Sequence, residues 1–280
     1  MTKTAQEQGA EARALYIQLL KDCLTFSLWD GADGSIQWNK PTLVQRAVGK
    51  AAKVIKGDYA KAPHPTAQEL RKEGRDWPVL AHTMIGVKRI DNLQFCVENV
   101  IKNNVPGDLI ETGVWRGGAT IFMRGILKAY GVTDRRVWVA DSFEGLPEPD
   151  EKKYAADRGD KHHTLSFLAV SMEQVKENFA RYGLLDEQVC FLKGWFKDTL
   201  QNAPLKRLAV ARLDGDMYQS TMDALTSLYP RLSPGGYLIV DDYGVVPACR
   251  TAVDDYRNAN NIREPIQDID GWGVFWQRAQ

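Results

Sequence analysis

From Asp108 onward, short runs of apolar residues alternate with segments long enough to form helices. The apolar runs cover residues 109–112, 137–140, 189–192, 208–213 and 237–240. Helix-like segments lie between them at 120–130, 171–182 and 220–232. This alternation is typical of consecutive βαβ units, which build a mostly parallel sheet with helices on its faces. We therefore expect an α/β fold for this part of the chain. Two further short runs, 262–269 and 274–277, follow a helix predicted at about 250–258 and predict a closing hairpin.

The first hundred residues read instead as helices joined by loops. An apolar stripe at helical spacing is predicted from Tyr16, Leu19, Leu20, Cys23 and Leu24. A basic-faced helix is expected over 42–56, a polar connection over 58–78 and another helix over 90–101. A chain of 280 residues fits an α/β domain with an extension. We therefore divide it into a helical N-terminal extension or lid, 1–80, and an α/β domain, 81–280.

The composition argues against several classes of partner. Lys and Arg number 36 and Asp and Glu number 36, so the chain lacks the basic footprint of a general nucleic-acid binder. The longest apolar runs are too short to span a bilayer, and the polar N-terminus lacks the apolar core of a signal peptide. Four scattered cysteines without a CxxC pair fit reduced thiols. We expect a cytoplasmic protein without nucleic-acid or membrane partners.

The residues directly after each apolar run are the candidates for binding, because parallel sheets bind ligands beyond the carboxyl ends of their strands. After the first run, Gly113 allows a tight turn, and Gly117 and Gly118 allow a ligand to approach the N-terminus of a helix. Trp115 stands where a dinucleotide-binding fingerprint has glycine, so a turn that binds no ligand stays open.

The next two strand ends favour a nucleoside. Asp141 and Ser142 follow the second run, and a carboxylate there can accept hydrogen bonds from both hydroxyls of a ribose. The alternative role for either residue is to cap a turn or helix. Gly194 and Trp195 follow the third run, where an aromatic ring could flank an adenine or simply belong to the core. Together with the glycine turn, these residues predict a nucleoside-containing cofactor.

Four carboxylates follow the fourth and fifth runs, namely Asp214, Asp216, Asp241 and Asp242. If the two strands are neighbours, these groups converge and repel one another unless a cation lies among them or some are protonated. Carboxylate oxygens suit Mg²⁺, Mn²⁺ or Ca²⁺. The alternative is that Asp216 and Asp242 cap helices and the others are solvated.

The segment 150–166 is long, charged and without a clear period. Long loops at a ligand-bearing edge are often lids over a site. This one carries His162 and His163, either of which could orient a substrate hydroxyl. A mobile, solvated loop is the alternative.

In combination, these motifs resemble the macrocin O-methyltransferase (TylF-like) family. The resemblance covers about 76–278 and is carried in order by 76–78, 83–86, 89–93, 107–118, 140–147, 212–221 and 235–243. It implies a class I S-adenosylmethionine (SAM) methyltransferase with a Rossmann-like fold, whose seven-stranded sheet has a reversed last strand. It also implies a divalent metal, usually Mg²⁺, O-methylation of a sugar on an antibiotic-type natural product, and a homo-oligomer.

The resemblance also implies roles for individual residues. Glu111, Gly113 and Gly117 would shape the cofactor site, and Thr83, Met84 and Ile85 would close over the methionine end of the cofactor. Asp141 would hold the ribose, with Ser142, Gly194 and Trp195 near the adenosine. Asp214, Asp241 and Asp242 would bind the metal, Asp216 would be the general base, and the segment with His162 and His163 would cover the acceptor.

Other functions stay open at this point. A metal-dependent enzyme that methylates a catechol or another non-sugar vicinal diol would need the same carboxylates, because both kinds of acceptor chelate a metal. A nicotinamide-dependent oxidoreductase is opposed by the glycine pattern and by the carboxylates. A non-catalytic nucleoside-binding protein with this fold is the remaining alternative.

Overall fold

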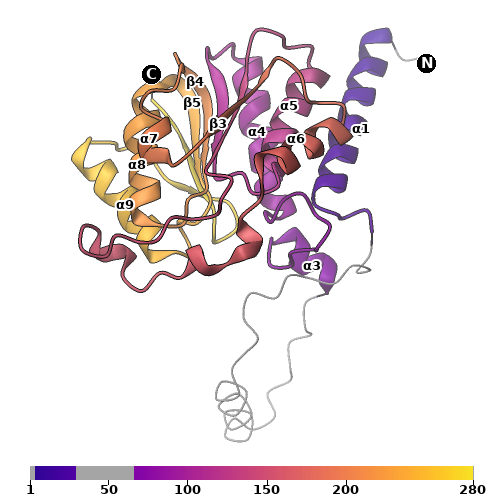
Figure 1. Ribbon diagram of the computed structural model, residues 1–280. Coiled ribbons are helices and arrows are strands. Elements are labelled where there is room, and N and C mark those ends of the chain that lie inside the picture. Colours follow the sequence, from indigo (N-terminus) through magenta and orange to yellow (C-terminus); the bar gives the residue numbers. More distant parts are fainter. Residues whose placement is uncertain (1–3, 30–65, 280) are drawn as a thin grey trace, which may run out of the picture.

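The computed structural model describes residues 4–29 and 66–279 and is built on a seven-stranded sheet (Figure 1). The strands are β1 (Asp108–Thr112), β2 (Val137–Asp141), β3 (Val189–Lys193), β4 (Leu208–Leu213), β5 (Leu232–Val240), β6 (Gln267–Asp268) and β7 (Val274–Gln277). Their order across the sheet is β3-β2-β1-β4-β5-β7-β6. Pairing is parallel from β3 to β5, and β7 is antiparallel to β5 and β6. The predicted mostly parallel sheet with a reversed last strand is confirmed.

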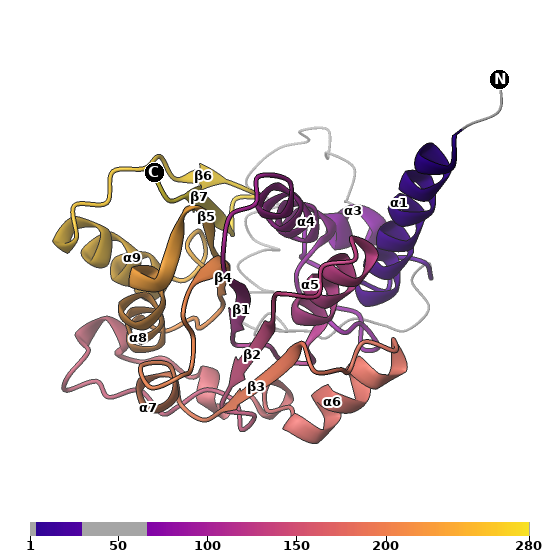
Figure 2. The ribbon, with the colours of Figure 1, turned by 90° about the horizontal axis from the view of Figure 1, so that it is seen from above.

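Helices cover both faces of this sheet (Figure 2). One face carries α1 (Ala5–Leu24), α4 (Val87–Lys102), α5 (Gly118–Ala129) and α6 (Met172–Arg181), whereas the other carries α7 (Phe196–Thr199), α8 (Tyr218–Leu228) and α9 (Pro247–Ala259). The shorter elements are α3 (Ala67–Lys72) and the 3₁₀ turns η1 (Ala155–Asp157), η2 (His162–Thr164), η3 (Ser166–Leu168) and η4 (Tyr229–Arg231). None of the described helices is long and apolar enough to cross a bilayer.

The strands divide their side chains between two apolar clusters, one on each face. Leu109 and Ile239 belong to the cluster under α4 and α5, while Ile110 and Leu238 belong to the cluster under α8 and α9. Successive side chains of a strand point to opposite faces, so a sheet covered on both sides has apolar residues at most positions. This is why the strands appear in the sequence as continuous apolar runs.

Helix α1 packs on α5, although not through the whole stripe that was predicted. Leu20 and Leu24 are buried as expected, but Tyr16 is 38% exposed and Leu19 is 55% exposed. The prediction was wrong for these two residues because the stripe that includes Ile17 faces the protein instead. Leu20 fits against a helical glycine of α5, Gly125, where a Cβ atom would lie 2.2 Å from Leu20 Cδ2.

The segment before α4 contains one helix that the sequence did not predict. The connection expected over 58–78 is wrong over Ala67–Lys72, where α3 begins after Thr66 in a capping box, whereas 73–78 is non-helical as expected. The Thr66 hydroxyl accepts from the Glu69 N–H (3.2 Å), and the Glu69 carboxylate accepts from the Thr66 N–H (2.7 Å). These reciprocal bonds satisfy N–H groups at the helix start and stabilise even a short helix. The helix expected over 42–56 lies outside the described residues.

Candidate active site

Two cavities open at the edge of the sheet where the parallel strands end. The larger has a volume of about 520 Å³ and the smaller about 280 Å³. Both are lined by Met84, Gly113, Trp115, Leu168, Asp214 and Asp216. The two cavities therefore meet at the loops that follow β1 and β4, the edge at which open α/β sheets bind ligands.

The loops at this edge hold an unusual number of residues in left-handed backbone conformations. Trp115 (φ 48°) follows β1, Phe143 (φ 59°) follows β2 and Asp216 (φ 52°) follows β4. Gly113 (φ 80°) lies so close to the next loop that a Cβ atom there would be 1.7 Å from the carbonyl oxygen of Asp214. Strained residues of this kind persist where the surrounding structure enforces them, and they cluster at functional sites.

The smaller cavity collects the residues predicted to surround the adenosine. Asp141, Ser142 and Trp195 line it, together with Gly113. The two carboxylate oxygens of Asp141 accept hydrogen bonds from the N–H groups of Val114 and Phe143, each at 2.7 Å. These bonds join the loops after β1 and β2 and fix the Asp141 carboxylate at the cavity wall.

The larger cavity contains the residues predicted at the methionine end, Thr83, Met84 and Ile85. Glu111, which was predicted to shape the cofactor site, lines the same cavity. One carboxylate oxygen of the buried Glu111 is bound by Arg212, whereas Oε2 has no hydrogen-bond partner among the described residues. Burial, partly offset by the Arg212 charge, raises the pKa of Glu111 to about 7.

Two predicted cofactor residues, Gly117 and Gly194, line neither cavity. Gly117 (φ 86°) precedes α5, and a Cβ atom there would lie 2.8 Å from Val175. The next residue, Gly118, donates its N–H to the carbonyl oxygen of His82 at 3.0 Å. The close approach at this helix N-terminus is thus made by the protein's own backbone, whereas the sequence suggested a ligand.

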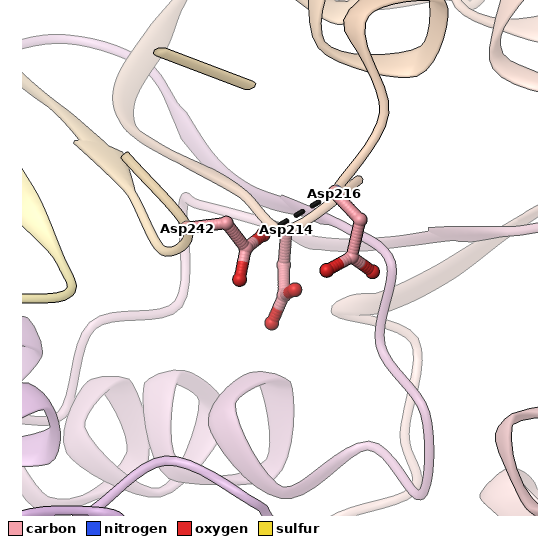
Figure 3. A group of neighbouring side chains, drawn as sticks. All are labelled: Asp214, Asp216 and Asp242. Atoms are coloured by element: carbon pink, nitrogen blue, oxygen red, sulfur yellow. Dashed lines mark hydrogen bonds between the residues drawn. The ribbon is translucent and has the colours of Figure 1, made fainter. Parts of the chain in front are cut away.

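Three carboxylates meet between the two cavities. Asp214 and Asp216 follow β4 and Asp242 follows β5, and oxygen atoms of all three lie within 4.8 Å of one another (Figure 3). The N–H of Asp216 donates to an Asp242 carboxylate oxygen at 3.3 Å, the bond drawn in the figure. The predicted convergence of the two strand ends is therefore present, and the alternative of four solvated or capping carboxylates does not describe it.

The electrostatics of this cluster disfavour simultaneous ionisation. Burial and the neighbouring Asp241 charge raise the pKa of Asp214 well above its ordinary value, and burial and the Asp216 charge do the same for Asp242. Burial also raises the pKa of Asp216 to about 6, although the nearby His162 opposes this shift. A cation among these carboxylates would remove the repulsion.

The fourth carboxylate, Asp241, is held differently. One of its oxygens accepts from Arg212 and the other from Arg89. Arg212 also binds Glu111 and Asp214, so one guanidinium serves three carboxylates. Asp241 lines the larger cavity but does not belong to the three-carboxylate cluster. Both arginines lie within motifs of the family resemblance, yet nothing in their spacing marked them as partners of Asp241.

The segment 150–166 is anchored at the site. The buried Asp157 accepts hydrogen bonds from the N–H groups of Tyr218 (2.6 Å) and Gln219 (3.0 Å), at the start of α8. Three residues later, Asp160 binds Nδ1 of His162 at 2.6 Å. His162 lines the larger cavity, whereas His163 does not. The expected position of the segment over the cavity agrees with this geometry, while most of its side chains are exposed to solvent, as the alternative expects.

Replacing Asp157 with alanine should destabilise the protein by about 1 kcal/mol, the usual cost of losing a helix N-cap. The N-cap residue of α8, Met217, offers no side-chain hydrogen bond of its own, so Asp157 is the side chain that caps this helix. Urea unfolding of the variant measures the loss. An Asp150→Ala variant in the same segment is the matched control, and equal stability of the two would contradict the capping role.

The sheet topology and the cavities at its carboxyl edge define the class I methyltransferase fold. A solved calicheamicin methyltransferase with 17% identity shares this fold, with a TM-score of 0.58 over 89% of this chain and 98% of that chain. The chain belongs to the macrocin-O-methyltransferase (TylF) family, whose model matches residues 13–278. The match begins well before the expected residue 76, so the part of α1 from residue 13 onward belongs to the family pattern.

Among characterised relatives, the chain is 54% identical over 270 residues to the Streptomyces olivaceus enzyme named 8-demethyl-8-(2,3-dimethoxy-α-L-rhamnosyl)-tetracenomycin-C 4'-O-methyltransferase, covering 96% of this chain and 94% of that one. It is 61% identical over 214 residues to demethyldecarbamoylnovobiocin O-methyltransferase of Streptomyces niveus, covering 76% and 82%. The solved O-methyltransferase NovP is 50% identical, with a TM-score of 0.82 over 96% of this chain and 100% of that chain.

Proposed function

We propose that this methyltransferase transfers a methyl group from SAM to a sugar hydroxyl on an antibiotic-type natural product, with the help of a divalent metal ion. The observation that carries the proposal is the carboxylate cluster at the junction of a nucleoside-sized cavity and a larger one. The names of the relatives point to the same chemistry, because they include a rhamnosyl and a novobiocin acceptor.

The smaller cavity suits the adenosine of the methyl donor. Asp141 retains lone pairs for the ribose hydroxyls, and Trp195 offers an aromatic ring for the base. The methionine end would then enter the larger cavity beside Thr83–Ile85. There the unpaired Oε2 of Glu111 is an acceptor for a charged amine. SAM brings its methyl group on a sulfonium, so the chain has mainly to align the acceptor oxygen with that methyl.

The residues present also fit a divalent ion. Five carboxylates gather at this edge against the two guanidinium groups of Arg89 and Arg212, which leaves an excess of negative charge. We assign Asp214, Asp241 and Asp242 as the ligands, since each Asp241 oxygen keeps a second lone pair beside its arginine. A bound Mg²⁺ would lower the pKa of a coordinated hydroxyl.

Asp216 is the group that we assign as the general base. It lines both cavities and therefore lies between donor and acceptor, where a proton must be removed. His162 lines the acceptor side of the larger cavity, and the bond between its Nδ1 and Asp160 orients the imidazole toward the place where a neighbouring hydroxyl of the sugar would lie. Arg158 and its neighbours over 156–160 form part of the wall around that acceptor.

An acceptor assay tests the proposal. The protein is incubated with SAM, Mg²⁺ and, in parallel, the dimethoxyrhamnosyl tetracenomycin, demethyldecarbamoylnovobiocin and a simple catechol, and products are identified by mass spectrometry. We expect methylation of a glycoside, no methylation of the catechol, and loss of activity in a metal chelator. Methylation of the catechol alone would support the non-sugar diol instead, and full activity in chelator would remove the metal. If SAM fails to bind, a non-catalytic protein becomes the better explanation.

A further inference from the structure

Arg89 is a buried side chain that joins three separate parts of the chain. It is the third residue of α4 and only 4% exposed. One of its nitrogen atoms, Nη1, donates to Asp241 after β5, and Nε lies 3.0 Å from an oxygen of Asp270 in the β6–β7 hairpin. The Asp270 side chain is fully buried, so Arg89 is its counter-ion as well. A buried charge of this kind is costly to leave unpaired.

The surrounding backbone leaves a passage for this side chain. A Cβ atom on Gly74 would lie 2.5 Å from Arg89 Nη2, and one on Gly273 would lie 3.0 Å from Arg89 Cδ. Gly273 is not in the left-handed region, so its backbone conformation does not require glycine. The space that its missing side chain leaves is filled by the stem of Arg89. The guanidinium lies 5.5 Å from the ring of Trp272, which covers it.

We propose that Arg89 is a positioning residue that holds Asp241 in the orientation needed to bind the divalent ion. The inference rests on the proposed function, in which Asp241 is a ligand. Arg212 cannot do this alone, because it also serves Glu111 and Asp214. Without Arg89, one oxygen of Asp241 would lose its partner and the carboxylate could turn away from the ion. The planar guanidinium matters here, since it reaches Asp241 and Asp270 from different nitrogen atoms.

The test is Mn²⁺ binding to the free protein, measured by electron paramagnetic resonance without any acceptor. In Arg89→Met we expect the Mn²⁺ dissociation constant to rise at least about tenfold, as for other partners of metal ligands. In Arg89→Lys the Mn²⁺ dissociation constant should rise less than in Arg89→Met, because lysine keeps the positive charge but lacks the planar guanidinium with its several donors. Gly273→Ala, which keeps the charge but crowds the stem, should also weaken binding.

Two further variants separate the explanations. Arg124→Met removes another buried arginine, paired with Asp186 at 2.6 Å, and should leave Mn²⁺ binding unchanged. Asp241→Asn should weaken it. Equal or tighter Mn²⁺ binding in Arg89→Met would overturn the inference, because it is the result expected if Arg89 only repels the ion. Weaker binding in Asp241→Asn would still support Asp241 as a ligand in that case. Unchanged binding in Asp241→Asn would overturn that assignment and the inference with it. S-adenosylhomocysteine binding reports whether each variant is folded.

Discussion

Asp216→Asn is expected to lose roughly 100- to 10,000-fold in turnover, the range that a general base contributes. Asparagine has a similar shape but cannot accept the proton from the acceptor hydroxyl. The variant should still bind S-adenosylhomocysteine and Mn²⁺ with nearly unchanged affinity, because neither ligand depends on Asp216 in the proposed site. Steady-state kinetics and Mn²⁺ titration of the same preparation provide the two measurements.

The pH dependence offers a second measure of the same residue. Burial raises the pKa of Asp216 to about 6, so its carboxylate is the base above that value and is protonated below it. The rate should therefore fall as the pH decreases through about 6, and a bound dication would move this fall to lower pH. Normal turnover in Asp216→Asn would exclude the base assignment. A large loss of Mn²⁺ affinity would instead make Asp216 a metal ligand, as its place in the three-carboxylate cluster allows.

Arg212→Met is expected to reduce the free energy of unfolding by about 3–5 kcal/mol, the typical cost of breaking a buried ion pair from one side. Arg212 is 2% exposed and is bound to Glu111, Asp214 and Asp241. Methionine fills similar space but leaves these carboxylates with one cation fewer. The melting temperature should fall by roughly 10 °C, given about 2–4 °C per kcal/mol for a chain of this size.

The sign of the pH effect distinguishes this loss from simple cavity formation. In the natural protein, the Arg212 guanidinium lowers the pKa of Glu111 and so opposes the effect of burial. Without Arg212, this pKa should rise further above its value in the unfolded chain. A carboxyl with a raised pKa in the folded state stabilises the fold at low pH and loses that contribution as the pH rises. The variant should therefore be closest to the natural protein near pH 5. A deficit that is equal at pH 5 and pH 8 would argue against lost charge pairing.

The fold and the position of the site were predictable from local patterns. The parallel strands are mostly apolar because the sheet is covered on both faces, and a parallel sheet brings its strand ends to one edge. Asp214 and Asp242 therefore had to approach each other once β4 and β5 were neighbours. The partners of Asp241 were not predictable in this way. Arg89 lies on a helix 152 residues away, and no periodicity links it to a strand end.

Local sequence patterns also failed where the same pattern fits more than one tertiary arrangement. Helix α1 carries apolar residues on more than one stripe, and only its packing on α5 decides that Leu20 is buried while Leu19 is exposed. In the same way, the segment 150–166 has no regular period in its sequence, and it is held in place by the Asp157 carboxylate, which accepts from the N–H groups at the start of α8. Both outcomes depend on tertiary contacts that a short window of sequence does not contain.

The charged network has a consequence for how this chain is synthesised. Glu111 and Arg212 are separated by 101 residues, and Arg89 and Asp241 by 152. The N-terminal part of the chain leaves the ribosome first, so Arg89 and Glu111 stay solvated and without these partners until β4 and β5 have been synthesised. Contacts this distant in sequence form slowly, since the intervening chain must first be ordered. A chain released before β5 is complete would therefore lack Asp241 and Asp242, and Arg89 would have no carboxylate of the site to bind.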